Sequence, residues 1–276
     1  MITVSIVTYH HSIGEVCKVV TSVLSDSVMK LYIVDNSTND TLREISAISE
    51  KIKYIHSMNL GYGAGHNIAI REAIELGSTY HVVVNPDIYF KNGVLERLVD
   101  YMEKNKDVGQ IMPKVYYPNG DLQCLCKLIP TPLDLICKRF LPYFITKKRM
   151  YRFQLGFTGY DKIMNVPYLS GCFMFFRISA LQEIGLFDER FFMYPEDIDI
   201  TRRIHEKYKT IFFPDVFIIH AHAAASKTNF KMLKVHILNM IKYFNKWGWY
   251  FDSRRKRINK KVLKDLEKMD GDNNNS

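Results

Sequence analysis

The sequence predicts an α/β fold with a mostly parallel central sheet covered by helices on both faces. In the first half of the chain, short runs of β-branched and apolar residues alternate with segments of helical spacing. The predicted strands are apolar at nearly every position, which is typical of strands buried on both faces. Polar residues and glycines follow these strands directly, at the sheet edge where parallel sheets bind ligands.

Five strands are expected in the first half of the chain, with a helix after each of the first four. The expected strands cover residues 3–9, 31–37, 53–57, 81–87 and 108–117. The first helix should begin at Ser12, which forms a capping box with Glu15, and run to about Leu24. The other expected helices cover about 41–50, 68–77 and 94–105, and a glycine-rich loop, NLGYGAGHN, occupies 59–67.

The second half is less regular. Residues 118–165 are basic and contain prolines, and we expect them to form an irregular inserted lobe. A strand and a helix over 166–181, a loop and a helix over 185–208, a strand over 210–223 and a helix over 230–247 should follow. The predicted domains are therefore a body over 1–230, with the insertion at about 118–165, and a C-terminal helix with a basic, partly disordered tail over 231–276.

Composition excludes several classes of protein. Of 276 residues, 47% are hydrophobic, which suffices for a full core and excludes a disordered chain. Five cysteines without a paired spacing indicate reduced thiols in the cytoplasm. The strand-like N-terminus, MITVSIVTYH, is not expected to be a signal peptide. No run reaches the ~20 apolar residues of a membrane-spanning helix.

The net charge of +9 is concentrated in two patches. Residues 135–160 and 254–261 each hold six basic side chains and no acid, and the rest of the chain is net negative. Because a nucleic-acid-binding protein shows a basic face on its folded body, we expect no nucleic-acid partner. Two local patches favour attraction to an anionic surface such as a lipid leaflet.

The glycine loop does not match the dinucleotide-binding fingerprint. That fingerprint needs a third glycine where His66 stands, and no acid follows at the expected distance. Two interpretations remain open on spacing alone. The loop either brings backbone N–H groups to a phosphate or sugar, or it is a tight turn from strand to helix.

Two carboxylates are expected at the ligand-binding edge of the sheet. Asp35 ends the second strand, where it can accept hydrogen bonds from a base or ribose. Its polar neighbours suit a turn or a helix cap, which is the preferred interpretation of this residue taken alone. Asp87 follows Pro86, which cannot donate to the strand ladder and so ends the pairing. Asp87 can then hold Mg²⁺ or Mn²⁺ together with substrate phosphates, or it can form a local turn.

The segment PEDID opens a predicted helix. Pro195 suits its first position, and Glu196 and Asp197 suit its first turn, where the helix dipole favours negative charge. Asp199 and Arg203 are spaced to form an ion pair. Two interpretations remain open. The acids only stabilise the start of the helix, or one of them is a general base, for which Asp197 is the preferred candidate.

Two histidines, His220 and His222, end the last predicted strand and share one of its faces. Both could reach a metal or a diphosphate. A hydrogen-bonded structural role is the alternative, and it is the preferred interpretation for His222.

Taken in order, these segments resemble the family 2 glycosyltransferases of the A-type nucleotide-sugar fold. They are most similar to bacterial rhamnosyltransferase-like enzymes of cell-surface polysaccharide assembly. The resemblance runs from about residue 2 to 230, ends with the late histidines and Ser226, and rests on these motifs: SIVTYH, VDNS, N-x-G-x-G-x-G-x-N, NPD, SGCFMFFR and GLFDERFFMYPEDIDI.

The resemblance implies a reaction and its residues. The reaction would be an inverting, metal-dependent transfer of a sugar, with rhamnose as a guess, from a dTDP- or UDP-linked donor to a cell-surface glycan or lipid-linked acceptor. Asp197 would be the base with Glu196 beside it, and Asp87 and His220 would contact Mg²⁺ or Mn²⁺. The residues implied at the donor are Thr8, Tyr9, Asp35, Asn59, Gly61, Asn67 and Asn85.

Two further points accompany the resemblance. Asn85 replaces the first acid of a D-x-D element, which removes one charge and lowers the expected metal affinity. The alternative function is a non-catalytic nucleotide-sugar or glycan-binding module, against which the complete NPD and ED elements argue.

The segment 138–153 mixes basic with apolar residues, as either an interfacial membrane segment or a solvated loop does. We expect a cytoplasmic protein, peripheral on the inner face of the cell membrane.

Overall fold

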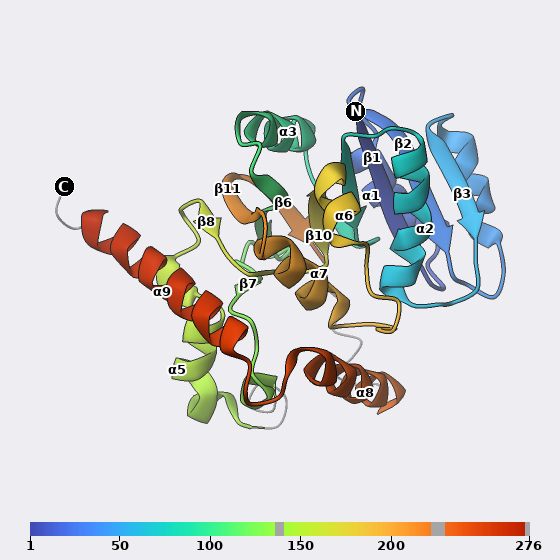
Figure 1. The fold of residues 1–276 in the computed structure, drawn as a ribbon. Helices are drawn as coiled ribbons and strands as arrows, with labels where there is room; N and C mark the ends of the chain where they lie inside the picture. Colours follow the sequence, from blue (N-terminus) through green and yellow to red (C-terminus); the bar gives the residue numbers. More distant parts are fainter. Residues whose placement is uncertain (136–140, 222–229, 274–276) are drawn as a thin grey trace.

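The fold is a mixed α/β fold, which confirms the prediction (Figure 1). The structure, a computed structural model, describes residues 1–135, 141–221 and 230–273. Within these ranges the strands of the main sheet are β1 (Ile2–Thr8), β2 (Val28–Asp35), β3 (Ile52–His56), β4 (Tyr80–Val84), β5 (Ile88–Tyr89), β6 (Val108–Tyr116), β8 (Met164–Asn165), β10 (Phe173–Arg177) and β11 (Lys209–His220). A separate small sheet pairs β7 (Cys126–Lys127) with β9 (Tyr168–Leu169).

The main sheet runs in the order β3-β2-β1-β4-β10-β6-β11-β5, with β8 also paired to β11. Neighbours from β3 to β4 are parallel, as are β6 and β11. Strand β10 lies antiparallel between β4 and β6, so these two strands still point the same way. The carboxyl ends of six strands therefore meet at one edge, as a parallel sheet requires.

Helices cover both faces of this sheet. The α-helices described are α1 (Ile13–Val23), α2 (Tyr62–Glu75), α3 (Val94–Lys104), α5 (Tyr143–Phe153), α6 (Ile178–Ile184), α7 (Glu196–His205), α8 (Phe230–Trp247) and α9 (Ser253–Asn273), with 3₁₀ helices η1 (Thr41–Ile48) and η2 (Gly156–Thr158). The predicted capping box of Ser12 and Glu15 is present at α1. The helix expected over 41–50 is the 3₁₀ helix η1.

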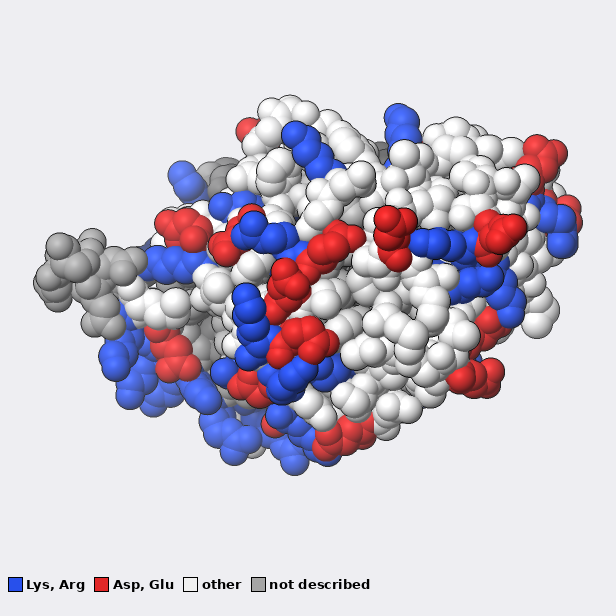
Figure 2. Space-filling model, turned by 90° about the horizontal axis from the view of Figure 1, so that it is seen from above, with Lys and Arg blue, Asp and Glu red and all other residues white. Residues whose placement is uncertain are grey.

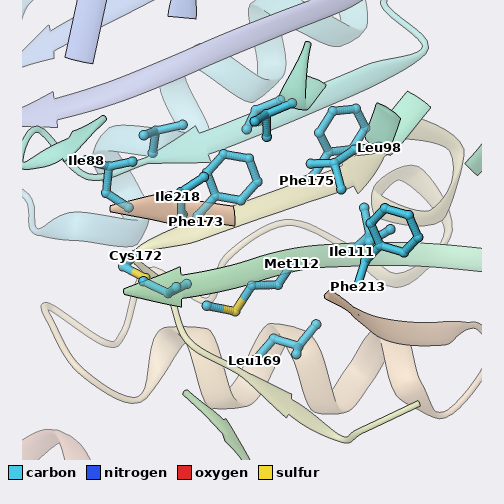
Figure 3. Close-up of a cluster of buried hydrophobic side chains, with 14 of the residues drawn as sticks. Ile88, Leu98, Ile111, Met112, Leu169, Cys172, Phe173, Phe175, Phe213 and Ile218 are labelled. Atoms are coloured by element: carbon cyan, nitrogen blue, oxygen red, sulfur yellow. The ribbon is translucent and has the colours of Figure 1, made fainter. Parts of the chain in front are cut away.

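Alternation along the strands separates two apolar layers. Phe173 and Phe175 of β10 join the larger cluster, which includes side chains of α1 and α3 (Figure 3). Met174 and Phe176 point to the other face and pack with α2, α6 and α7. Each central strand is thus buried on both faces, which explains its nearly continuous apolar sequence.

Three expectations need correction. Helix α2 begins at Tyr62, inside the segment 59–67 that was predicted to be a loop, because the chain turns sharply at Gly61. The segment 118–165 is not wholly irregular, since it contributes β7, α5, η2 and β8. The basic segment expected as a tail forms α9, whose Val262 and Leu266 are buried in the larger cluster. Residues 274–276 lie outside the described ranges.

No helix in the described ranges has the length and apolar character needed to span a bilayer. Helices α5, α8 and α9 lie along the lower and left side of the view in Figure 1. The division into a body and a C-terminal part remains a prediction.

Candidate active site

The two residues predicted to contact a metal lie together at the carboxyl edge of the sheet. Asp87 follows β4 and its side chain is one-third exposed. Its Oδ1 lies 3.3 Å from Nε2 of His220, the last residue of β11. The Ala221 N–H donates to the Asp87 carbonyl oxygen at 3.0 Å. Strand pairing between β5 and β11 thus places this carboxylate and imidazole side by side.

Gln123 fixes the orientation of the His220 ring. The Gln123 amide N–H donates to the His220 carbonyl oxygen at 2.8 Å, and its Oε1 lies 3.0 Å from His220 Nδ1. Because Oε1 is an acceptor, Nδ1 carries a proton and Nε2 faces Asp87. Gln123 was not predicted from the sequence, since it lies in the segment expected to be irregular and belongs to no recognisable motif.

The environment of His220 favours its charged form. Burial alone would lower its pKa, but the neighbouring Cys172 sulfur and the Asp87 carboxylate outweigh burial and raise the pKa of His220 to about 10. The Asp87 carboxyl group therefore lies beside an imidazole whose surroundings favour the protonated form.

Tyr62 connects this pair to the rest of the site. Its hydroxyl lies 3.0 Å from Asn85 Oδ1 and 2.6 Å from the Gly171 carbonyl oxygen. Burial, and then the nearby carboxylates, raise the pKa of Tyr62 well above its ordinary value, so the hydroxyl remains a donor. Tyr62 stands inside the glycine-rich motif, and its flanking glycines concealed it in the sequence.

The predicted base and its neighbour open α7. Glu196 and Asp197 are both buried. Asp197 Oδ2 accepts a hydrogen bond from the Gly171 N–H at 2.9 Å, and Oδ1 accepts one from the Ile198 N–H at 2.7 Å. Tyr194, just before them, has a φ of 92°, a strained conformation for a residue other than glycine. The acids are held in place by the backbone and are not solvated helix caps.

The two acids are pushed toward different protonation states. Burial and the charge of Asp197 raise the pKa of Glu196 to about 8. Burial also raises the pKa of Asp197, but Lys127, the two backbone N–H donors and the Tyr168 hydroxyl oppose this. Glu196 therefore holds a proton at neutral pH, whereas the groups around Asp197 favour its ionised form.

Lys127 is a site residue that the sequence did not reveal. It lies in β7, opposite Tyr168 of β9, and its ammonium group is 4.6 Å from the centre of the Tyr168 ring. The side chain is buried. Burial lowers the pKa of Lys127, while Asp197 raises it. Lys127 thus supplies positive charge on the side of Asp197 facing the small sheet.

Asp35, predicted at the nucleoside, is fully buried. Its Oδ1 accepts from Thr8 at 3.0 Å and from the Ser37 N–H at 3.1 Å, and its Oδ2 accepts from the Tyr54 hydroxyl at 2.9 Å. These contacts show that Asp35 organises the turn after β2. The neighbouring Tyr9 is half exposed, so it is open to a ligand at this edge.

The glycine motif forms a tight turn from strand to helix. A Cβ at Gly61 would lie 2.2 Å from the Phe192 carbonyl oxygen, which instead accepts the Tyr62 N–H at 2.9 Å. Asn59 accepts the Gly61 N–H at 3.3 Å. Both N–H groups are therefore engaged within the protein. Asn67 lies within α2, where its side chain bonds to both backbone groups of Phe187.

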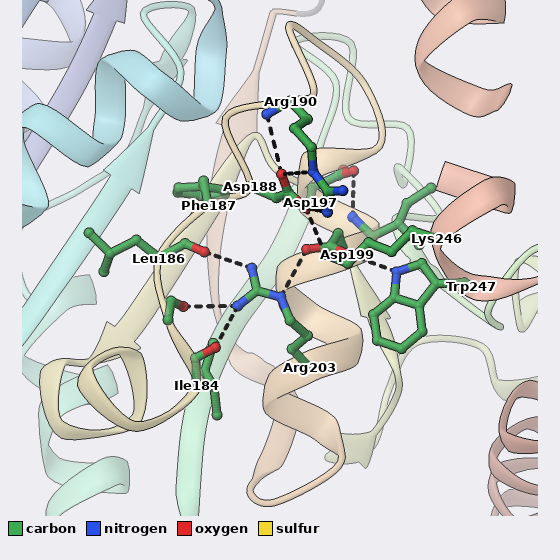
Figure 4. Close-up of polar contacts among 12 residues, drawn as sticks. Ile184, Leu186, Phe187, Asp188, Arg190, Asp197, Asp199, Arg203, Lys246 and Trp247 are labelled. Atoms are coloured by element: carbon green, nitrogen blue, oxygen red, sulfur yellow. Dashed lines mark hydrogen bonds and ion pairs between the residues drawn. The ribbon is translucent and has the colours of Figure 1, made fainter. Parts of the chain in front are cut away.

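Asp199 belongs to a separate structural network (Figure 4). The predicted pair is confirmed, because Arg203 Nε donates to Asp199 Oδ2 at 2.8 Å. Lys246 and the Trp247 indole N–H reach Asp199 Oδ1 at 2.6 and 2.8 Å. With both oxygens engaged, Asp199 ties α7 to α8 and is a poor candidate for the base.

The structure thus brings Asp87, His220, Asn85, Glu196 and Asp197 into one connected site. It places Asp35 and Asn67 in closed contacts of the fold. His222 and Ser226 lie outside the described residues. The roles assigned to all these residues remain predictions.

Solved structures share the overall fold. The crystal structure of Staphylococcus aureus TarS 1–349 superposes with a TM-score of 0.57 at 15% identity, covering 95% of this chain and 70% of that one. A crystal structure of GalNAc-T7 with UDP, GalNAc and Mn²⁺ gives a TM-score of 0.57 at 15% identity, covering 79% of this chain and 43% of that one. At this identity the likeness shows the fold alone.

Curated relatives are also similar in sequence. N-acetylglucosaminyl-diphospho-decaprenol L-rhamnosyltransferase of Mycobacterium tuberculosis is 26% identical over 180 residues, 60% of this chain and 57% of that protein. Rhamnosyltransferase WbbL of Escherichia coli is 25% identical over 232 residues, 79% of this chain and 83% of that protein. The low-salt glycan biosynthesis hexosyltransferase Agl10 of Haloferax volcanii is 28% identical over 181 residues, 64% of this chain and 53% of that protein.

The chain spans little more than half the length of the mycobacterial relative. The family model described as glycosyl transferase family 2 matches residues 3–185. That match covers well over half of the sequence, so the chain belongs to glycosyl transferase family 2.

Proposed function

We propose that this chain is an inverting glycosyltransferase that moves a sugar from a nucleoside-diphosphate donor to a hydroxyl of a glycan or lipid-linked acceptor. Family membership supplies the reaction class. The observation that carries the mechanism is the connected path from Asn85 through Tyr62 and Gly171 to Asp197. This path fixes the turn that bears Asp87 relative to the proposed base.

Asp197 acts as the general base. It is ionised while Glu196 holds a proton, so the pair divides the two protonation states between them. Asp197 removes the proton of the acceptor hydroxyl as the acceptor oxygen attacks the anomeric carbon of the donor. A positioned base of this kind contributes ~10²–10⁴-fold in rate. Attack from the face opposite the leaving diphosphate inverts the configuration at that carbon.

The residues at the sheet edge fit a divalent cation. No cluster of three or more His, Cys, Asp or Glu side chains that could hold a metal occurs in the described ranges. Asp87 and His220 are the two side chains that we propose as protein ligands of the cation. Mg²⁺ commonly binds through one or two carboxylates, substrate phosphates and water, which this small donor set suits. Ligation by His220 requires its neutral form, so a bound cation would replace its proton. The metal would neutralise charge on the departing diphosphate.

The relatives guide the choice of substrates. Three of the similar proteins are named rhamnosyltransferases or hexosyltransferases, and one name includes a lipid diphosphate acceptor. We therefore propose a dTDP- or UDP-linked hexose donor, with rhamnose tested first, and a role in polysaccharide assembly on the cytoplasmic side of the membrane. A non-catalytic binding module is the weaker proposal, because binding alone does not need two adjacent buried acids whose surroundings favour different protonation states.

A donor screen and one variant test this proposal. A thermal-shift panel of nucleoside diphosphates and nucleotide sugars with Mn²⁺ should reveal a stabilising donor. With that donor, Asp197→Asn should lower the transfer rate at least 100-fold while the donor-induced shift in Tm persists. Equal loss of donor binding and transfer would refute the base assignment. Donor binding with neither transfer nor hydrolysis in the native protein would favour the binding module.

A further inference from the structure

Large apolar side chains project into water from two neighbouring parts of the surface. On α5, Phe144 and Ile145 are 80% and 62% exposed. In the turn between α8 and α9, Tyr250 and Phe251 are 72% and 97% exposed. Single exposed apolar residues are common on soluble proteins, but adjacent exposed aromatics indicate a contact surface.

Hydrogen bonds hold these two parts together as one surface. The Asn259 side chain of α9 bonds to the N–H and the carbonyl oxygen of Ile129, both at 2.9 Å. Five residues further along the same segment, Asp134 accepts from Arg149 of α5 at 2.7 Å. The segment from Ile129 to Asp134 therefore joins α5 to α9, and we call the two helices with residues 249–251 the α5–α9 surface.

The same two helices carry many exposed basic side chains. Helix α5 exposes Lys147, Lys148, Arg149 and Arg152 and has no acid, and α9 begins with the basic run 254–261, in which all the basic residues except Arg255 are exposed. Figure 2 shows Lys and Arg side chains gathered along the lower left of that view. A bilayer that contains anionic lipid complements this combination of apolar tips and basic side chains.

The same charge argues against a second copy of the chain as the partner. Two copies meeting through this surface would bring many Lys and Arg side chains together, whereas the centre of a protein interface is depleted of charge. A folded anionic protein would match the charge, but it would not provide the apolar phase that Phe251 and Phe144 can enter.

The surface is also rigidly connected to the helix of the proposed base. Asp252, next to Phe251, forms two buried hydrogen bonds with Arg202 of α7, at 2.8 and 2.9 Å. The Arg202 guanidinium stacks 3.9 Å from the centre of the Trp247 ring. A partner that binds the α5–α9 surface therefore also restrains the position of α7, which carries Asp197.

We infer that the α5–α9 surface docks on an anionic lipid bilayer, with Phe144, Ile145, Tyr250 and Phe251 entering the interface and the Lys and Arg side chains contacting headgroups. Docking would bring the active site to a lipid-linked acceptor, and this purpose rests on the proposed function. The docking itself does not depend on the enzyme being active.

Vesicle flotation of the full chain tests the docking. Binding should be strong on vesicles of phosphatidylcholine with phosphatidylglycerol, weak on phosphatidylcholine alone, and reduced by salt. Phe144→Ser with Phe251→Ser should abolish it, and Ile48→Ser, at a half-exposed apolar residue of η1, should not. Lys147→Glu with Lys148→Glu should lower the partition coefficient at least about fivefold per charge, and Lys91→Glu with Lys104→Glu should have little effect.

Other results would overturn the inference. Vesicle binding that does not depend on lipid charge, or that is unchanged in both the aromatic and the lysine variants, excludes this surface as the membrane-binding site. A concentration-dependent dimer in sedimentation that Phe251→Ser abolishes, together with no vesicle binding, identifies a second copy as the partner. Because these side chains are exposed, the variants should keep the native Tm. Vesicle binding without transfer on any acceptor would refute the proposed function and leave the docking intact.

Discussion

The Tyr62 hydroxyl lies 3.0 Å from the side-chain oxygen of Asn85 and 2.6 Å from the carbonyl oxygen of Gly171. Asn85 begins the turn that carries Asp87, and the Gly171 N–H holds the carboxylate of Asp197 at 2.9 Å. One partly buried phenol thus bridges the part of the site proposed to hold the diphosphate and the part proposed to activate the acceptor.

Replacing Tyr62 with phenylalanine should loosen this bridge while keeping the packing of the ring. We expect kcat to fall about 10–100-fold, because small displacements of reacting groups are costly, with KM for the donor nearly unchanged. Steady-state kinetics measure both. Tyr54→Phe is the matched control, since it removes the hydroxyl that bonds to Asp35 and should mainly raise KM for the donor. Similar kinetic changes in the two variants would contradict the bridging role.

Gln123 should tune the binding of a divalent cation without touching it. Gln123 orients the His220 ring, and loss of such a partner typically lowers metal affinity 10–100-fold. In Gln123→Ala, the Mn²⁺ concentration for half-maximal transfer should rise by that factor, while saturating Mn²⁺ restores most of the rate. Asp87→Asn should raise the requirement further. Transfer that continues unchanged in EDTA would exclude a metal-dependent reaction.

Much of the site could be predicted because it follows strand ends. Asp87 and His220 stand at or just beyond the ends of apolar strands, so the topology alone brings them to one edge. Tyr62, Lys127 and Gln123 escaped prediction for a physical reason. Their roles depend on contacts across more than twenty positions, and Lys127 and Gln123 lie in a segment without periodicity. The glycines of 61–65 signalled close packing against Phe192, Phe187 and Val7, which sequence alone could not distinguish from phosphate binding.

Lys127 should set the pH range of the reaction. Its positive charge stabilises the ionised form of Asp197. In Lys127→Met the pKa of Asp197 should rise, so the acid limb of the kcat profile moves to higher pH and activity recovers as the pH increases. Lys127→Arg keeps the charge and should keep the profile. A rate that falls by the same factor at every pH would show that Lys127 serves packing only.

Glu196 should make the protein less stable as the pH rises. Burial and Asp197 raise its pKa from 4.5 to about 8 in the folded protein, so between these values the unfolded chain is ionised while the folded protein still holds the proton. The unfolded state then binds fewer protons. This contribution to the free energy of unfolding is complete below about pH 4.5 and is lost progressively up to about pH 8.

The variant Glu196→Gln tests this pH dependence, because glutamine resembles the protonated acid and cannot ionise. Its Tm should match the native protein at pH 5 and exceed it at pH 8, as calorimetry can measure. The exposed Glu75→Gln is the control and should leave the pH dependence unchanged. If both variants follow the native curve, Glu196 is ionised in the folded protein, and the division of protonation states between Glu196 and Asp197 fails.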